Sequence, residues 1–428
     1  MAEYKKRIAD DLLRLKLMGM GAVLIDGPKW CGKTTTAEQH ARSVLYMNDP
    51  KRRHSYIQLA TMSPETLLKG ATPRLIDEWQ ITPTLWDSIR FACDHRGEDG
   101  QFILTGSSVP VEQGEDTEFF SHSGTGRIAK LRMRPMSLWE SGESIGGISL
   151  SDLFAGKALP AESSEINIED LAFWVCRGGW PKATLQNPDI ALGRAYDYFE
   201  AITETDINRV DAVKRDSQRA KRLMRAYARY QGAQVSVSKI KSDMMENEGD
   251  SMNEKTIDSY LEILRKLFVI EDMPAWNPNL RSKSAIRTAD TRYFIDPSIA
   301  VAALGAGPQD LIYDLETFGL LFETMAVRDL RIYADAMNGN VFHYRDKDGL
   351  ECDAVIHLRN GHYGLVEIKL GGDSNIEAGA ATLISLKDKI DTTRMPSPSF
   401  LMVLTGLSSY AYMRPDGVWV VPIATLKP

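Results

Sequence analysis

The stretch Gly27-Pro28-Lys29-Trp30-Cys31-Gly32-Lys33-Thr34 decides the fold of the N-terminal part of this chain. It fits the pattern GxxxxGK(S/T) at every fixed position and lies between an apolar run, 22–26, and a helix-forming segment, 34–47. Glycines let backbone N–H groups curl around a β-phosphate, Lys33 can reach the β- and γ-phosphates, and the Thr34 hydroxyl can bind Mg²⁺. The sequence therefore predicts a strand, a phosphate-binding loop and a helix, with the loop and the adjacent Thr35 holding ATP.

A second motif lies where such a nucleotide site requires acidic groups. Asp77 and Glu78 end a short apolar run, where Asp77 is predicted to orient Mg²⁺ through its water shell and Glu78 to polarise the attacking water. The next apolar run ends in Thr105-Gly106-Ser107, and Thr105 and Ser107 are expected to contact the γ-phosphate or the attacking water. A chance glycine-rich turn at 27–34 is the alternative, and this downstream motif argues against it.

Arg127 follows the glycine-rich sequence Gly124-Thr125-Gly126. An arginine in such a loop can project its guanidinium toward the γ-phosphate of ATP, either in its own subunit or in a neighbouring subunit of a homo-oligomer. The alternative is an ordinary surface arginine. Both interpretations remain open from the residues alone.

The length of 428 residues calls for two to four domains. Up to about residue 140, short apolar runs alternate with helical patterns, which predicts an α/β domain with a parallel sheet. From about 167 to 308 helical periodicity dominates, and around 232–272 the order helix, acidic turn, helix and β-like run is typical of a winged helix-turn-helix. A helix near 318–333 and several strands follow, which predicts a C-terminal α/β domain.

The expected elements set the expected domain boundaries. Strands of the first domain are predicted at 22–26, 56–59, 74–77 and 101–105. Helices of the middle part are predicted at 194–209, 216–230, 237–245 and 254–269, with a β-like run at 268–271. Strands of the last domain are predicted at 341–344, 352–358, 363–370 and 400–404. A seam rich in Gly and Ser near 141–147, with polar residues at 160–166, divides the chain into 1–165, 166–315 and 316–428.

Composition excludes several classes of protein. The 51 basic and 58 acidic side chains give a net charge of −7, which excludes a uniformly basic nucleic-acid coat but permits local basic patches. The four cysteines show no CxxC spacing, so neither a disulfide framework nor a thiolate zinc site is predicted. The scattered cysteines predict a reduced, cytoplasmic chain. Because no run of about eighteen uncharged apolar residues occurs, we expect no signal peptide and no membrane span.

Two strands of the last domain carry the pattern D…ExK, made by Asp353 and by Glu367 with Lys369. The two carboxylates can hold Mg²⁺ or Mn²⁺ while Lys369 steers a water or stabilises developing charge on phosphorus. Because side chains alternate along a strand, Asp353 and Glu367 share a face only if the hairpin loop has an odd length. Arg359-Asn360-Gly361 offers such a loop, whereas a two-residue turn at Asn360-Gly361 would put the carboxylates on opposite faces.

A basic stripe is predicted on the helix at 216–230. The arginines at its positions fall within about a third of the helical circumference, and apolar side chains occupy another face. The five residues are Arg215, Arg219, Arg222, Arg225 and Arg229. They can neutralise backbone phosphates of DNA, but a solvated face paired with acids of another domain or subunit is an equal alternative.

Taken together, the runs GPKWCGKTT, LIDEWQ, FILTGSS, GR and PMSLWE, with Gly178-Gly179-Trp180-Pro181, resemble the AAA+ superfamily ATPases of bacteria and archaea that carry a C-terminal domain of unknown function. This resemblance implies a P-loop NTPase core of AAA+ type, a mainly α winged-helix-like middle and a C-terminal α/β domain similar to restriction endonucleases of the PD-(D/E)xK class. It also implies that Glu323, on the helix before the strands, supplies a further carboxylate.

These observations predict an ATPase that uses Mg²⁺ and ATP. Its nucleotide state is expected to rearrange a C-terminal module that binds DNA or resembles a nuclease, and DNA cleavage by that module is left open. The alternative is a nucleotide-gated regulatory or protein-interaction module in which the nuclease fold is inactive and the basic stripe binds protein. The physiological target is not encoded in any motif of the chain.

Overall fold

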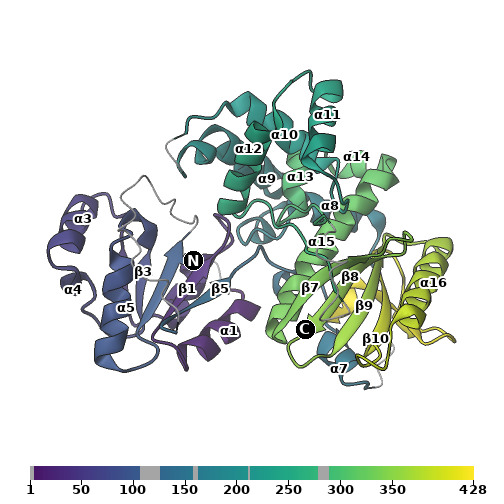
Figure 1. Ribbon diagram of the computed structural model, residues 1–428, viewed down its shortest axis with the longest axis horizontal. Coiled ribbons are helices and arrows are strands. Elements are labelled where there is room, and N and C mark those ends of the chain that lie inside the picture. The colour runs from purple at the N-terminus through teal and green to yellow at the C-terminus, as the bar shows by residue number, and fades with distance from the viewer. Residues whose placement is uncertain (1–3, 107–125, 158–161, 211–212, 278–288) are drawn as a thin grey trace.

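A computed structural model describes residues 4–106, 126–157, 162–210, 213–277 and 289–428. One sheet lies in the N-terminal part and another in the C-terminal part, and helices from the middle of the chain lie above the gap between the two sheets (Figure 1). Within these described residues, no helix has the length and apolar character that crossing a membrane would require.

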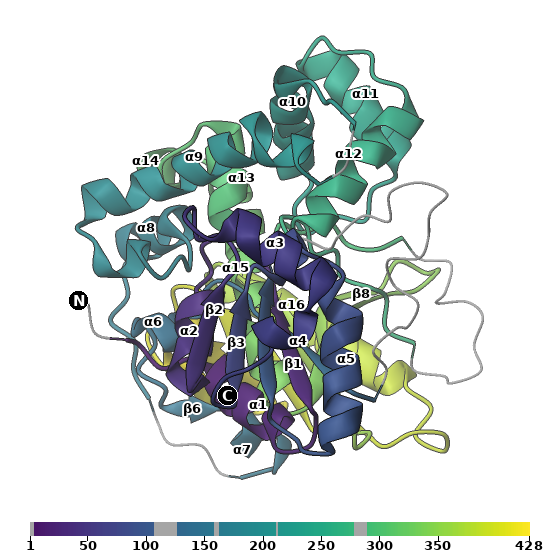
Figure 2. The same ribbon diagram turned by 90° about the vertical axis from the view of Figure 1, so that its left-hand side faces the viewer.

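The N-terminal domain is a parallel sheet covered by helices on both faces. The strand order β2-β3-β4-β1-β5 is all parallel and fits the P-loop NTPase fold. One core lies under α3 and α5 and a second lies under α1 and α2, and Figure 2 looks onto this domain. The elements are α1 (Ile8–Leu17), β1 (Ala22–Asp26), α2 (Lys33–His40), β2 (Ser43–Tyr46), α3 (Arg53–Met62), α4 (Pro64–Leu67), β3 (Arg74–Asp77), η1 (Trp79–Ile81), α5 (Leu85–Arg96), β4 (Phe102–Gly106) and β5 (Ile128–Arg132).

Two predicted elements of this domain are wrong. The run 56–59, predicted as a strand, lies inside helix α3, and the predicted helix 34–47 ends at His40, before strand β2. Periodicity alone cannot separate a short apolar run in a strand from one in a helix. Pairing with the whole length of β3 makes β2 a strand, whereas Tyr56 and Leu59 pack against the core from a helix.

The middle of the chain is mainly helical. Two helices, α11 and α12, are followed by isolated antiparallel bridges that join Ile270 to Phe294 and Met273 to Thr291, so the β-like run expected at 268–271 forms bridges rather than a strand in the described residues. Phe268 has a positive φ of 58°, which ends the helix before it. The elements are α8 (Ile168–Arg177), η3 (Ala183–Leu185), α9 (Pro188–Glu204), η4 (Asp206–Asn208), α10 (Ser217–Ala228), α11 (Val237–Asn247), α12 (Glu254–Lys266), α13 (Pro297–Leu304) and α14 (Pro308–Tyr313).

The C-terminal domain is a mixed six-stranded sheet of order β11-β12-β10-β9-β8-β7. One face of this sheet shares a core with α15 and the middle helices, and the other face is covered by α16. The elements are α15 (Leu315–Ala336), β7 (Gly339–Arg345), β8 (Glu351–Leu358), β9 (Tyr363–Lys369), α16 (Asp373–Lys389), β10 (Phe400–Thr405), β11 (Tyr412–Met413), β12 (Val418–Pro422), η6 (Ile423–Thr425) and β13 (Leu426–Lys427).

The segment that follows the N-terminal sheet packs with the rest of the chain rather than with that sheet. It contains α6 (Leu138–Ser141), β6 (Ile148–Ser149) and α7 (Leu150–Phe154). Strand β6 pairs in parallel with β13 at the end of the chain, and Leu138, Leu150 and Leu153 belong to the core of the middle and C-terminal parts. This packing favours an N-terminal domain that ends before the predicted boundary at residue 165.

Candidate functional site

The loop from Gly27 to Lys33 joins β1 to α2 at the carboxyl end of the sheet. Two glycines are required by the backbone: Gly27 has φ +150° and a Cβ there would overlap the carbonyl oxygen of Met133, and Gly32 has φ +100° at the start of α2. The Lys33 ammonium is buried and donates to the carbonyl oxygens of Gly27 (2.9 Å) and Pro28 (2.7 Å). Its partners are neutral, so an incoming phosphate can replace them.

Asp77 joins the two hydroxyl groups that the sequence placed near the phosphates. Its Oδ1 accepts from Thr34 Oγ1 on α2 and from Thr105 Oγ1 on β4, each at 2.6 Å. Asp77 pairs with Thr105 in the register of the neighbouring parallel strands β3 and β4, so both residues lie at the carboxyl end of the sheet. Ser107, also predicted to act here, lies outside the described residues.

Glu78 follows Asp77 in a left-handed conformation with φ +57°. Its Oε2 accepts from Gln80 Nε2 at 2.5 Å. Burial first, and the Asp77 charge second, raise the pKa of the Glu78 carboxyl above its usual value. A carboxyl with a raised pKa beside the phosphate loop is suited to accept a proton from water.

Arg127 does not lie at the phosphate loop of its own subunit, so that part of the prediction is wrong. Its carbonyl oxygen accepts from the N–H of Ala22 at the start of β1, whereas the loop begins at the other end of that five-residue strand, which spans about 16 Å. The Arg127 guanidinium pairs with Asp94 on α5 at 2.7 Å. In a parallel sheet all strands begin at one end and finish at the other. Arg127 lies at the amino end and the loop at the carboxyl end, and this distance excludes a role for Arg127 within its own nucleotide site.

A different arginine, Arg132, lies at the carboxyl end of β5, next to the end of β1. Its Nε donates to Asp26 Oδ1 at 2.7 Å, and its guanidinium lies 4.4 Å from the centre of the Phe268 ring in the middle domain. No motif of the sequence marks Arg132 as part of the site. The run IAKLR does predict a strand that ends in arginine, but its position beside β1 follows only from the strand order.

The phosphate loop also contacts the middle domain. The ammonium of Lys29 lies 2.6 Å from Asp206 Oδ1 in η4, and the Trp30 ring lies 5.3 Å from the ring of Tyr198 on α9. A Cβ at Gly32 would meet Pro181 at 3.4 Å. Thr35, the last predicted loop residue, is exposed on the first turn of α2. The loop therefore touches two parts of the middle domain, the GGWP sequence and α9 with η4.

At the C-terminal sheet, the predicted D…ExK residues come together. The register that pairs Ala354 with Val366 puts Asp353 beside Glu367. Lys369 Nζ lies 3.0 Å from Asp353 Oδ2 and 2.7 Å from Glu367 Oε2. One lysine therefore neutralises part of the charge of both carboxylates.

The hairpin between these strands has the three-residue loop rather than the two-residue turn. Leu358 N–H donates to the His362 carbonyl at 2.8 Å, and Gly361 N–H donates to the Leu358 carbonyl at 3.0 Å. Gly361 has φ +88°. This left-handed glycine closes an odd loop, which leaves Asp353 and Glu367 on one face.

Glu323 on α15 lies at the same cluster and is held by the middle domain. Tyr293 Oη donates to Glu323 Oε1 at 2.5 Å. Burial, followed by the Asp353 charge, raises the pKa of both Glu323 and Glu367 to about 8. Nevertheless, among the residues with described positions, no group of three or more His, Cys, Asp and Glu side chains is placed to hold a metal ion.

The arginines of the predicted basic stripe are engaged with acids of their own domain. Arg219 and Arg222 pair with Asp250 at 3.5 and 3.2 Å. Likewise, Arg225 pairs with Glu248 at 3.2 Å, and Arg229 pairs with Asp243 at 2.5 Å. The fifth, Arg215, is buried and donates to the Ile207 carbonyl and to Ser259 Oγ. These contacts favour the alternative in which the arginines are paired with acids rather than with DNA. The acids belong to the same domain, not to another domain or subunit.

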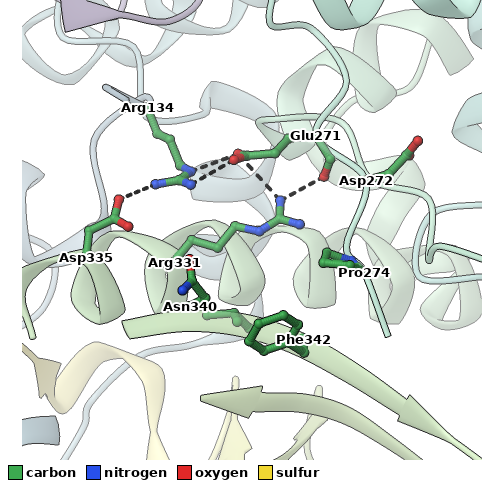
Figure 3. A pocket seen from close by; sticks show the side chains of 9 residues that line it. Arg134, Glu271, Asp272, Pro274, Arg331, Asp335, Asn340 and Phe342 are labelled. Carbon is green, nitrogen blue, oxygen red and sulfur yellow. Dashed lines mark hydrogen bonds and ion pairs between the residues drawn. The ribbon is translucent and has the colours of Figure 1, made fainter. Parts of the chain in front are cut away.

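A cavity of about 150 Å³ lies where the three parts of the chain meet (Figure 3). Arg134, two residues beyond β5, pairs there with Glu271 of the middle domain (2.7 Å) and with Asp335 of α15 (2.6 Å). Arg331 of α15 also pairs with Glu271, at 3.5 Å. Burial would raise the pKa of Glu271, but the charges of Arg134 and Arg331 outweigh it and hold that pKa well below its usual range. This ion-pair junction ties the three parts together.

Solved structures with some overall likeness have low identity. A Walker-type ATPase of Pyrococcus abyssi is 15% identical, with a TM-score of 0.41, over 71% of this chain and 99% of that chain. The ORC2 protein of Aeropyrum pernix, in ADPNP and ADP complexes, is 14% identical, with a TM-score of 0.34, over 72% and 93%. Scores below 0.5 do not establish a shared overall fold.

Family models match three separate parts of the chain. Residues 168–310 and 318–426 match two domains of unknown function (DUF8612 and DUF4143), neither of which is described as a nuclease. A search of curated proteins gave no significant match. Residues 20–141 match a model described as an AAA domain. The N-terminal part of the chain is therefore an AAA-type P-loop domain, and this supports ATP binding and hydrolysis.

Proposed function

We propose that the protein hydrolyses ATP with Mg²⁺ at its N-terminal phosphate loop and that the nucleotide state repositions the middle and C-terminal domains. The observation that carries this proposal is that the Asp77 carboxylate accepts hydrogen bonds from Thr34 and Thr105 at the carboxyl end of the sheet, next to the loop that holds the buried Lys33. A carboxylate, a hydroxyl from the first turn of the helix and a lysine on a glycine-rich loop are the groups that a nucleoside triphosphate with Mg²⁺ requires.

Each residue has a distinct role in this proposal. Lys33 exchanges its two carbonyl partners for phosphate oxygens, while the loop N–H groups hold the β-phosphate. Glu78 accepts a proton from the attacking water, for which its raised pKa is suited. The hard oxygen donors of Thr34 and Asp77 fit Mg²⁺, which would offset the charge of the phosphates.

A chain of buried polar contacts supports coupling between the loop and the C-terminal domain. Arg7 donates to the carbonyl of Cys31 in the loop (3.0 Å) and pairs with Glu140 (3.0 Å), both side chains being buried. Two residues before Glu140, the N–H of Leu138 donates to Asp329 on α15 at 2.9 Å. The same helix carries Glu323 at the D…ExK cluster. A displacement of the loop would therefore be transmitted to the helix that lines that cluster.

Arg127 belongs to the proposal only as a residue that acts on another subunit. It lies at the amino end of the sheet, whereas its own loop lies at the carboxyl end, so it would reach a γ-phosphate only across an interface of a homo-oligomer. Loss of activity upon dilution, together with loss of activity in Arg127→Ala at high concentration, would support this arrangement.

For the C-terminal half we propose DNA as the partner, with the α11 and α12 region acting as a winged helix and Asp353 and Glu367 holding Mg²⁺ or Mn²⁺. The shared face of the two carboxylates supports this assignment. The second candidate is a nucleotide-gated regulatory or protein-interaction module with an inactive nuclease fold. The contacts of Lys369 with both carboxylates, and the ion pairs of the basic stripe, favour this second candidate.

One set of assays on the full-length protein separates these functions. ATP turnover in wild type and in Lys33→Ala tests the ATPase, with Lys69→Ala, an exposed lysine of the same domain, as control. Gel shifts with duplex DNA over a salt series, with and without nucleotide, test DNA binding. Plasmid cleavage in Mg²⁺ and in Mn²⁺ tests the nuclease. Turnover without DNA binding or cleavage would select the regulatory module, and equal turnover in wild type and Lys33→Ala would refute the ATPase.

A further inference from the structure

Lys29 is a second lysine in the phosphate loop, four residues before Lys33 and with a different kind of partner. Lys33 donates to neutral carbonyl groups, whereas Lys29 is paired with a carboxylate of another domain. That carboxylate, Asp206, is only 5% exposed, while the Lys29 side chain is 35% exposed. Asp206 belongs to no motif of the nucleotide site.

The loop is also held to the middle domain at the residue next to this ion pair. Trp30 has a left-handed backbone with φ +66°, and its ring packs on Tyr198, which in turn packs on Trp180 at 4.4 Å. A bulky residue other than glycine adopts such a φ only where its surroundings hold it. Lys29 and Trp30 are therefore held by η4 and α9 of the middle domain.

ATP and ADP place different charges beside this contact. A triphosphate adds a γ-phosphate at the open end of the loop, where the flexible Lys29 side chain can reach it, whereas a diphosphate does not. The buried Asp206 carboxylate then competes with the γ-phosphate for the Lys29 ammonium. Because like charges repel more strongly in a partly buried site, Asp206 also opposes the γ-phosphate directly.

From this geometry, and resting on the proposed ATPase function, we infer that Lys29 and Asp206 form a sensor that distinguishes a bound triphosphate from a diphosphate. With ADP or an empty loop, Lys29 stays on Asp206 and holds the middle domain to the loop. With ATP, Lys29 moves to the γ-phosphate and this contact with η4 is released. The pair therefore determines specificity for the γ-phosphate and reports its presence to α9.

The test compares affinities of the full-length protein for the non-hydrolysable analogue AMPPNP and for ADP. Asp206→Asn should raise the ratio of AMPPNP to ADP affinity by about tenfold, which corresponds to about 1.4 kcal/mol, because Lys29 no longer gives up an ion pair when it moves to the γ-phosphate. Lys29→Met should lower the ratio, and Asp206→Asn should raise the ratio clearly less in the Lys29→Met background than in wild type, because only the direct repulsion between Asp206 and the γ-phosphate remains there. Glu204→Gln, which removes an ion pair with Lys221 at the end of α9, is the matched control and should leave the ratio unchanged.

Hydrogen exchange gives a second readout. Amides of residues 199–208 should exchange faster with AMPPNP than with ADP in wild type, and equally fast with both in Lys29→Met. An unchanged affinity ratio in folded Asp206→Asn, or an equal increase with and without Lys29, would overturn the sensor while the ATPase stands. If Asp206→Asn does not fold, an unchanged ratio in Lys29→Met overturns it. Wild type that binds neither nucleotide overturns both.

Discussion

The phosphate loop and the D…ExK cluster both place a lysine among oxygen atoms, but the two lysines differ in their partners. Lys33 donates to two neutral carbonyl groups, so its charge is available to an anion from outside. Lys369 lies between two carboxylates, so its charge is already offset within the chain. The arginines of α10 resemble Lys369, because they too are paired with acids. A cation in a motif indicates binding only when its present partner can be displaced.

The largest effect is expected at Lys33, the lysine whose partners are neutral. Lys33→Ala should lower ATP affinity by about 10²- to 10⁴-fold, because two charge-assisted hydrogen bonds of about 1.5–3 kcal/mol each are lost. Isothermal calorimetry with AMPPNP measures this effect, and Lys69→Ala serves as the control. Equal affinity in wild type and Lys33→Ala would show that the loop does not bind phosphate.

The second prediction separates binding from turnover at the same loop. Glu78→Gln should retain ATP affinity and lower turnover by about 10²- to 10⁴-fold, because the amide cannot accept the proton of the attacking water. Phosphate release at saturating ATP measures this, and Glu98→Gln, an exposed glutamate of the same domain, is the control. Normal turnover in Glu78→Gln would remove its role as a base.

The third prediction tests whether the charge at the D…ExK cluster is accessible to a cation. Burial, followed by the Asp353 charge, raises the pKa values of Glu323 and Glu367 to about 8, so a cation that binds at lower pH must displace a proton from the cluster. Mn²⁺ affinity should therefore increase from pH 6 to pH 8, by about tenfold per pH unit for each proton released.

Asp353→Asn provides the corresponding variant. It should lower Mn²⁺ affinity by about 10- to 100-fold, whereas Asp348→Asn on the exposed β7–β8 loop should not change it. Calorimetric titration of the full-length protein at both pH values measures these effects. Wild type that binds no Mn²⁺ would leave the cluster as a neutralised remnant and favour the inactive-fold alternative.

The smallest expected effect concerns the basic stripe. Because Arg219 and Arg222 are both paired with Asp250, the double change to Ala should alter duplex DNA affinity by less than about twofold. Asp250 is buried and loses both partners, so the free energy of unfolding should fall by about 1–3 kcal/mol. Lys239 and Lys255, exposed on α11 and α12, are the comparison, and their replacement should weaken DNA binding more if this region contacts DNA. A salt slope that falls by about one unit per arginine removed would restore the stripe as a DNA contact.

Sequence patterns predict most strongly those parts of the molecule that local geometry determines. GxxxxGK(S/T) predicts the loop because residues other than glycine rarely adopt the backbone conformations of Gly27 and Gly32. Arg359-Asn360-Gly361 predicts a hairpin at this position, but a three-residue loop and a two-residue turn both fit it, and only the pairing of the two strands decides the register. Contacts distant in sequence were not predictable: Asp206 lies 177 residues from Lys29, and the acids that pair with the α10 arginines follow the next helix. Arg127 lies at the amino end of the sheet because it precedes β5 and β5 runs parallel to β1, a pairing that no local pattern shows.

The ion-pair junction of Arg134, Glu271 and Asp335 has a consequence for unfolding. Arg134 follows Met133, whose carbonyl oxygen lies directly against Gly27, so the wall of the nucleotide loop and the junction are adjacent residues. Opening any one of the three domains would leave buried charges unpaired in the other two, which is costly. We therefore expect a single cooperative melting transition. A nucleotide bound to the N-terminal domain should raise the melting temperature of the C-terminal sheet as much as that of the N-terminal sheet.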